Sequence, residues 1–132
     1  MAQSKHLYYE IKSLPVTVNH ALGRTRTGRS YKTKAYKQWV KDFKTAYPKE
    51  RKIKDSQWYG IEIQLYFPLF YKNGNVRKKD VSNYIKYAED LVFGNLITYN
   101  GDSIDDCRIT EGEYFKIDSE EEKTIINIYC IE

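Results

Sequence analysis

The chain has 132 residues, a net charge of +4 and 15% aromatic residues. This length favours one domain spanning residues 1–132, and two cysteines are too few for a small domain held together by disulfides. No stretch approaches the roughly 18 consecutive apolar residues of a membrane helix, and the N-terminus lacks the apolar centre of a signal peptide. We therefore expect a cytoplasmic protein with no membrane partner.

The first elements in chain order are a short strand and a basic loop. Residues 6–12 alternate in the manner of a strand, and Pro15 ends that strand. The polar loop over residues 18–30 contains three arginines: Arg24, Arg26 and Arg29. This loop is either a solvated connection or a flap that closes over phosphate. We favour the flap because the arginine side chain matches phosphate geometry.

A strongly amphipathic helix is predicted over residues 33–47. One of its faces is apolar, and the opposite face carries a stripe of lysines: Lys34, Lys37, Lys41 and Lys44. A single acidic residue, Asp42, lies among these lysines. The lysine stripe is either an ordinary solvated face or a surface that contacts DNA.

Three more strands are predicted further along the chain. Residues 58–67 alternate cleanly between apolar and polar side chains. Residues 106–117 and 123–131 are separated only by an acidic turn, so we expect them to pair as an antiparallel hairpin. A basic loop over residues 71–79 ends in Arg77, Lys78 and Lys79. Together the elements predict a single α+β domain, with a mixed or antiparallel sheet of about four strands and two helices.

The second helix begins near Ser82 and carries most of the acidic chemistry. We predict that Ser82 is its N-cap, with Asp80 just ahead. Its polar face presents Asn83, Lys86, Glu89 and Asp90, and a second acidic point follows at Asp105 and Asp106. Carboxylates are the ligands that Mg²⁺ prefers, so these residues can form a metal site. The alternative is ordinary helix capping, an i,i+4 ion pair and turn chemistry.

Charge is distributed unevenly along the chain. Residues 1–60 carry 14 Lys and Arg against 4 Asp and Glu, whereas residues 61–132 carry 8 against 14. A basic first half beside an acidic second half suits an enzyme that holds a polyanion near a metal site. The same distribution is also found in many proteins with other functions.

The acidic pattern resembles the RusA family of Holliday-junction resolvases, whose motif is Asp-x-Asp-Asn-x-x-Lys-x-x-x-Asp followed by a downstream Asp-Asp. The matching residues here are Asp80, Asn83, Lys86, Asp90, Asp105 and Asp106. Upstream, Leu14-Pro15 with Asn19 resembles the family's loop after its first strand, and residues 28–31 before a helix also match. The resemblance implies a RusA-like homodimer that cuts DNA four-way junctions with paired symmetric nicks, leaving 5′-phosphate and 3′-hydroxyl ends.

The resemblance also implies roles for individual residues. Asp80 and Asp106 would hold Mg²⁺, for which Mn²⁺ can substitute, with Asp105 and either Asp90 or Glu89 assisting. Lys86 would neutralise charge that builds on the phosphate, and Asn83 would orient a ligand or a water. The residues expected to bind the DNA backbone are Arg24, Arg26, Arg29, Lys34, Lys37, Lys41, Lys44, Arg77, Lys78 and Lys79. We expect no small organic cofactor.

One departure from the motif matters, because Ser82 stands where the family usually places its second Asp. Either Ser82 is tolerated, with Glu89 or Asp90 supplying the missing charge, or catalysis is weakened. Two other functions therefore remain open. One is a protein that binds branched DNA without cutting it, and the other is a nuclease for flaps, forks or RNA.

Overall fold

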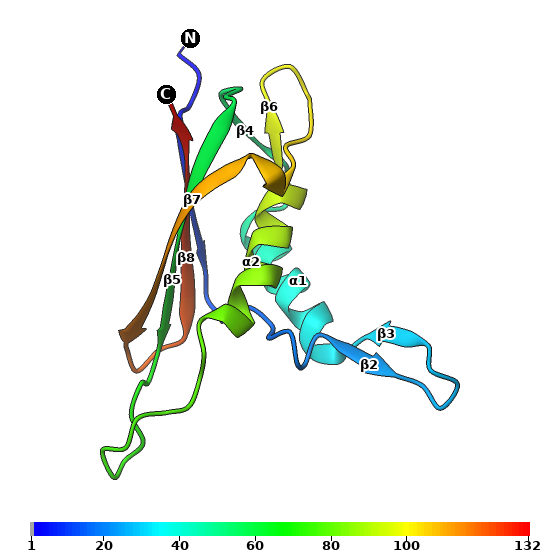
Figure 1. Ribbon diagram of the computed structural model, residues 1–132, viewed down its shortest axis with the longest axis vertical. Helices are drawn as coiled ribbons and strands as arrows, with labels where there is room; N and C mark the ends of the chain where they lie inside the picture. The colour runs from blue at the N-terminus through cyan, green and yellow to red at the C-terminus, as the bar shows by residue number, and fades with distance from the viewer. Residues whose placement is uncertain (1) are drawn as a thin grey trace.

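A computed structural model of the protein describes residues 2–132 (Figure 1). The centre of the protein is a mixed four-stranded sheet, and two helices cover one of its faces. The strands lie in the order β1-β8-β5-β7. They span His6–Ile11 (β1), Trp58–Phe67 (β5), Ile109–Asp118 (β7) and Lys123–Ile131 (β8). The predicted α+β class, with two helices and a mixed sheet of four strands, is confirmed.

The predicted antiparallel pairing of the last two strands is wrong. β8 pairs antiparallel with both β1 and β5, while β7 pairs parallel with the outer side of β5. The physical reason lies in burial: the β8 residues 124–126 and Ile128 are buried, whereas β7 is exposed along most of its length. An apolar run favours a central strand, and a run rich in charge favours an edge. The strand also begins at Ile109, because Asp106–Arg108 forms a 3₁₀ turn instead.

The core lies between the sheet and the helices. On β5 the predicted alternation is confirmed, because Ile61, Ile63 and Leu65 are fully buried while the residues between them are only partly covered. The first helix buries Trp39, whose indole Nε1 donates a hydrogen bond to the carbonyl of Tyr87 at 3.0 Å. That hydrogen bond connects the two helices and helps to position the second helix against the core.

We expect Ile63→Ala to lower the free energy of unfolding by about 2–5 kcal/mol, the usual cost of deleting a fully buried aliphatic side chain. Urea denaturation followed by circular dichroism measures this loss. Glu113→Ala, on the exposed edge strand, is the control and should change stability by no more than about 0.5 kcal/mol. Equal effects of the two substitutions would contradict the assignment of the core.

Both helices lie close to their predicted positions. Helix α1 (Lys34–Ala46) begins after Thr33, whose side chain accepts the backbone N–H of Tyr36. Helix α2 (Ser82–Gly94) differs in one detail, because Val81 is its N-cap and no side chain caps it. The predicted capping role of Ser82 is therefore wrong, since Ser82 is already helical and exposed to solvent. Neither helix of the described residues is long and apolar enough to cross a membrane.

Two pairs of three-residue strands were not predicted. The predicted loop over residues 18–30 forms most of a hairpin, β2 (Leu22–Arg24) and β3 (Ser30–Lys32), which extends away from the rest of the protein (Figure 1). The polar connection after α1 contains β4 (Arg51–Ile53), which pairs parallel with β6 (Leu96–Thr98). Strands this short carry no readable alternation, so only their long-range pairing reveals them.

Candidate active site

The polar face of α2 is arranged as the sequence predicts. Tyr84, Ala88 and Val92 face the core, while Lys86 and Asp90 are exposed on the opposite side. Asn83 and Glu89 flank these exposed residues and are half-buried. A run of polar groups therefore follows the helix from its first turn to Asp90.

Three carboxylates influence one another's charge near the C-terminal half of α2, and we call Glu89, Asp90 and Asp106 the acidic cluster. Burial is the main cause that raises the pKa of Glu89, and the charges of Asp106 and Asp90 raise it further. Although Asp90 is exposed as a residue, partial loss of water around its carboxyl group raises its pKa, with Lys86 opposing the shift and Asp106 adding to it. Asp106 lies in the 3₁₀ turn before β7. The cluster therefore combines two residues of α2 with a residue about 15 positions later in the sequence, and only the fold brings their charges within range of one another.

Two site residues on β7 were missed by the sequence analysis. The hydroxyl of Tyr114 donates a hydrogen bond to Oε1 of Glu89 at 3.3 Å, which opposes the rise in the pKa of that carboxyl group. Lys116 Nζ donates to the backbone carbonyl of Lys79 at 3.1 Å, directly beside Asp80. The only sequence signal was their alternation, since residues two apart on a strand share a face. Recognising that this face turns toward α2 required the register with β5.

Asp80 lies at the opposite end of α2 from the acidic cluster. Asp90 lies eight positions after Ser82, which corresponds to about 12 Å along the helix axis at ~1.5 Å per residue. Asp80 lies further out still, and carboxylate oxygens must approach Mg²⁺ to roughly 2.1 Å. This separation disfavours a single ion held by Asp80 and Asp90 together, and the metal ligands inferred from the sequence stay a prediction.

A divalent cation suits the chemistry of the acidic cluster. Within residues 2–132, no three His, Cys, Asp or Glu side chains form a ready-made metal-binding group. Mg²⁺ commonly uses only one or two carboxylates, together with water and substrate phosphate. Burial is the main cause of the raised pKa values of Glu89 and Asp90, and the negative charge of Asp106 adds to both; a bound cation would favour the ionised form of these carboxylates. The cluster thus fits a cation that is completed by substrate. Asp105 is exposed beside Asp106 and accepts the N–H of Arg108 through its backbone carbonyl at 3.1 Å.

The loop after β1 reaches the N-terminal half of α2. The backbone N–H of Val18 donates to the carbonyl of Asn83 at 2.9 Å, so this loop is joined directly to the polar helix. Pro15 is buried and Asn19 is exposed. The loop continues into the β2–β3 hairpin, where all three predicted arginines, Arg24, Arg26 and Arg29, are exposed to solvent. The structure thus connects the predicted phosphate-binding segment to the helix that carries the acidic residues.

The other predicted DNA-binding residues differ in whether their charged groups lie against aromatic rings or are open to solvent. All four residues of the lysine stripe on α1 are exposed. In the basic loop, Lys78 is exposed, whereas Arg77 stacks on the ring of Tyr71 at 4.8 Å and Lys79 lies 5.3 Å from the ring of Phe67. Lys86 also lies over a ring, that of Tyr87, at 5.5 Å. The stripe and the hairpin therefore offer more free charge than the basic loop.

The comparisons with known proteins identify a family. The family model described as Endodeoxyribonuclease RusA matches residues 13–129. None of the curated proteins compared with the chain matches it significantly. The matched region contains both helices, the acidic cluster, Asp80 and the arginine hairpin, and it covers most of the chain. The protein therefore belongs to the RusA family of endodeoxyribonucleases.

Proposed function

We propose that the protein is a Mg²⁺-dependent endonuclease that resolves DNA four-way junctions by paired symmetric nicks. The observation that carries the proposal is the acidic cluster, which lies beside Lys86 on the polar face of α2 in a chain of the RusA family. The exposed arginine hairpin and lysine stripe supply the positive charge that a DNA backbone requires. The products would carry 5′-phosphate and 3′-hydroxyl ends.

The side chains of the site would each act on one part of the reaction. A divalent cation, when bound, supplies activation of water and stabilisation of the leaving oxygen. Asp106, with Glu89 and Asp90, would hold that cation, and Tyr114 would keep the carboxylate of Glu89 oriented through its hydrogen bond. Lys86 would balance negative charge on the phosphate, and Asn83 would orient a neighbouring group. Ligation by Asp80 stays a prediction that its substitution can test.

Ser82 favours a second candidate function. Its side chain is exposed in the first turn of α2, where the family's second Asp would stand, and Glu89 lies seven residues further along the helix. That separation is about 10.5 Å at ~1.5 Å per residue, so Glu89 cannot occupy the missing position. A protein that binds branched DNA without cutting it would result if this carboxylate were essential.

Cleavage of a labelled synthetic four-way junction tests the proposal directly. We expect paired symmetric nicks in Mg²⁺ or Mn²⁺ and none in EDTA. Tight junction binding without nicks in either metal would contradict the nuclease proposal and support the binding function. Equal cutting of flaps, forks, RNA and junctions would instead show a nuclease with a different target.

Two symmetric nicks require two active sites, so we propose that the protein acts as a homodimer, matching the two-fold character of the junction. Light scattering during size-exclusion chromatography measures the mass of the particle. We expect about twice the mass of one chain, with or without junction DNA. A particle with the mass of a single chain in both conditions would contradict this proposal.

Junction binding should weaken steeply with salt, because each neutralised phosphate contributes about −0.9 to the slope of log K against log salt. Replacing Arg24, Arg26 and Arg29 together with glutamine should reduce the magnitude of that slope by about 2–3, if each arginine contacts one phosphate. Fluorescence anisotropy across a salt series measures the slope. Replacing three other exposed lysines, Lys12, Lys49 and Lys52, with glutamine removes the same charge and should change the slope much less. Equal slopes for the two triple variants would remove the hairpin from the DNA-binding surface.

Glu89→Gln should stabilise the metal-free protein at neutral pH. Because burial and its neighbours raise the pKa of Glu89, the folded state binds more protons than the unfolded state between the ordinary glutamate pKa and the raised value. Stability therefore falls as pH rises through that window, and the substitution removes this loss. We expect a gain below about 1 kcal/mol, since the group is partly exposed.

Urea denaturation in EDTA at acidic and neutral pH measures the effect of Glu89→Gln. Glutamine keeps the oxygen that accepts the hydrogen bond of Tyr114, so only the charge is lost. Glu120→Gln, on an exposed turn, is the matched control. An unchanged pH dependence in Glu89→Gln would show that the pKa of Glu89 is not raised in the folded protein.

A further inference from the structure

The connection between β5 and α2 forms a small hairpin that extends past the lower end of the sheet (Figure 1). Phe70 and Val76 pair across it in antiparallel fashion. Next to this pair, the backbone N–H of Tyr71 donates to the carbonyl of Asn75 at 2.8 Å. We call residues 69–77 the aromatic hairpin. Its internal hydrogen bonds give it a defined shape.

Both ends of the aromatic hairpin are joined to the sheet. The backbone N–H of Leu69 donates to Oδ1 of Asp118 at 3.0 Å, and the side chain of Leu69 packs against the core. Just after the hairpin, the carbonyl of Lys79 accepts a hydrogen bond from Lys116 Nζ at 3.1 Å. Asp80 follows directly in the chain. The hairpin is therefore anchored on both sides, close in the chain to a residue of the predicted cleavage site.

The aromatic hairpin has an apolar face that the protein leaves open to solvent. Phe70 and Val76 lie directly opposite each other in an antiparallel pair, so their side chains share one face. They are 49% and 63% exposed, and Val76 is the most exposed large hydrophobic side chain among residues 2–132. An apolar side chain stabilises a fold in proportion to the surface that it buries, so this pair contributes little to folding. Its surface is available to a partner.

Charge identifies the kind of partner. Residues 68–79 contain no acidic residue and four basic residues: Lys72, Arg77, Lys78 and Lys79. Of these, Lys72 and Lys78 are exposed to solvent. An apolar surface flanked by cations fits a partner whose flat apolar faces lie within an anionic backbone, as the bases of a nucleic acid do. Because the chain belongs to a family of endodeoxyribonucleases, that nucleic acid is DNA.

We propose that the aromatic hairpin recognises the branch point of DNA and gives the protein a preference for branched substrates. In a continuous duplex the base faces are covered by stacking, so an inserted apolar side chain must first separate neighbouring base pairs. At a branch point the stack is already interrupted, and Phe70 would pack on an exposed base at lower cost. Lys72 and Lys78 would contact the flanking phosphates. This inference rests on the proposed junction nuclease and names the feature that selects its substrate.

Binding to a four-way junction and to a linear duplex, measured by fluorescence anisotropy in EDTA, tests the inference without cleavage. The quantity compared is the junction preference, which is the Kd for the duplex divided by the Kd for the junction. Phe70→Ala should lower this preference about tenfold, as expected for loss of one ring that stacks on a base. Duplex affinity and its salt dependence should stay the same, because no charge is removed. Phe70→Trp keeps a stacking ring and should retain the preference.

Phe115→Ala is the matched control for Phe70→Ala. Phe115 is 41% exposed, and it lies on the face of β7 opposite to Tyr114, which contacts α2. Its removal should leave the junction preference unchanged. A junction that carries the fluorescent base 2-aminopurine at the branch point gives an independent signal. Its fluorescence should change when the unchanged protein binds but not when Phe70→Ala binds, and the same label in the middle of an arm should not respond.

The other possible results would overturn the inference. An unchanged junction preference in Phe70→Ala, or an equal loss in Phe115→Ala, would show that the hairpin does not recognise the branch point. Equal weakening of junction and duplex binding would make the hairpin a general DNA contact. A fall to the mass of a single chain in Phe70→Ala, measured by light scattering, would assign the apolar pair to a contact between two copies. Selective junction binding that Phe70→Ala loses, with no nicks in any metal, would support the inference while contradicting the proposed nuclease, so the two can fail separately.

Discussion

Asp106→Asn is expected to lower the rate of junction cleavage by about 100-fold or more, the effect of removing one group that stabilises transition-state charge. The negative charge of Asp106 contributes to the raised pKa of both Glu89 and Asp90, so Asp106 is the residue of the acidic cluster that influences both others. Junction affinity should change by less than about threefold, because the residue carries no positive charge for the backbone. Single-turnover cleavage and anisotropy measure the two quantities separately.

The control for this result is Asp102→Asn, the same chemical change in an exposed turn. It should cleave junctions like the unchanged protein. If Asp106→Asn also cleaved normally, the acidic cluster would have no role in the chemistry. A loss of binding together with cleavage would indicate damage to the fold, which circular dichroism would detect.

Asp80→Asn is expected to remove the paired nicks as completely as Asp106→Asn does. Ser82 replaces the carboxylate that the family places two residues later, and Glu89 lies two helical turns away. No carboxylate on α2 is therefore close enough to substitute for Asp80 when its charge is lost. Cleavage of the labelled junction in Mg²⁺ and in Mn²⁺ measures the loss.

Ser82→Asp provides the opposite change at the same end of the helix. It restores the carboxylate of the family motif, and a negative charge in the first helical turn is favourable to the helix dipole. We expect faster cleavage by about tenfold, the lower range for a residue that supports a metal site. Normal cleavage by Asp80→Asn, with no gain from Ser82→Asp, would confine the chemistry to the acidic cluster. Loss in both Asp80→Asn and Asp106→Asn would show that both ends of α2 serve one reaction, with Lys86 between them.

Features that depend on neighbouring residues were predicted well. The apolar period of α1, the alternation along β5 and the polar face of α2 all follow from side chains a few positions apart. The spacing from Asp80 to Asp106 was sufficient to indicate the RusA family, which the match over residues 13–129 confirms. These signals depend on residues that are close together in the sequence, so they can be recognised without knowledge of the fold.

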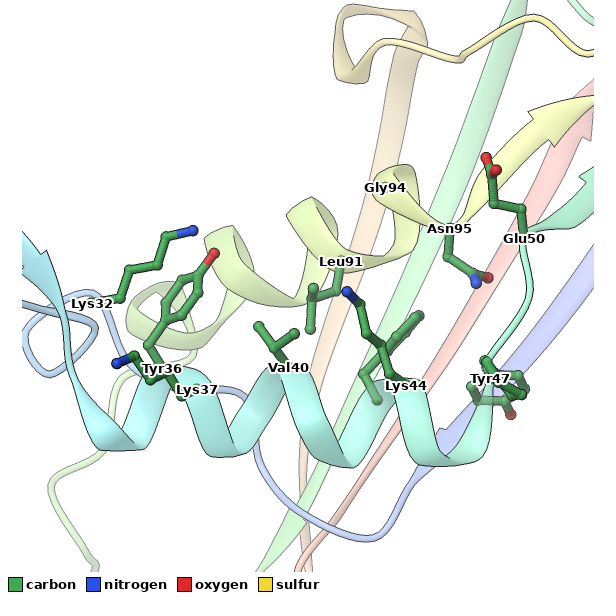
Figure 2. A pocket seen from close by; sticks show the side chains of 12 residues that line it. Lys32, Tyr36, Lys37, Val40, Lys44, Tyr47, Glu50, Leu91, Gly94 and Asn95 are labelled. Carbon is green, nitrogen blue, oxygen red and sulfur yellow. The ribbon is translucent and has the colours of Figure 1, made fainter.

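Features that depend on pairing were decided by the tertiary structure. The sequence places β7 and β8 next to each other, yet β5 lies between them because the apolar β8 is buried at the centre and the charged β7 takes the edge. That order turns Tyr114 toward Glu89 and carries Asp106 to the C-terminal half of α2. A groove lined by Val40 of α1 and Leu91 of α2 likewise exists only because the two helices pack side by side (Figure 2). Residue types and their spacing therefore determined the family and the helices of this protein. Burial of residues far apart in the sequence decided the strand order, and with it which carboxylates lie near one another. Strand order depends on contacts between distant residues, which the local pattern of side chains does not specify.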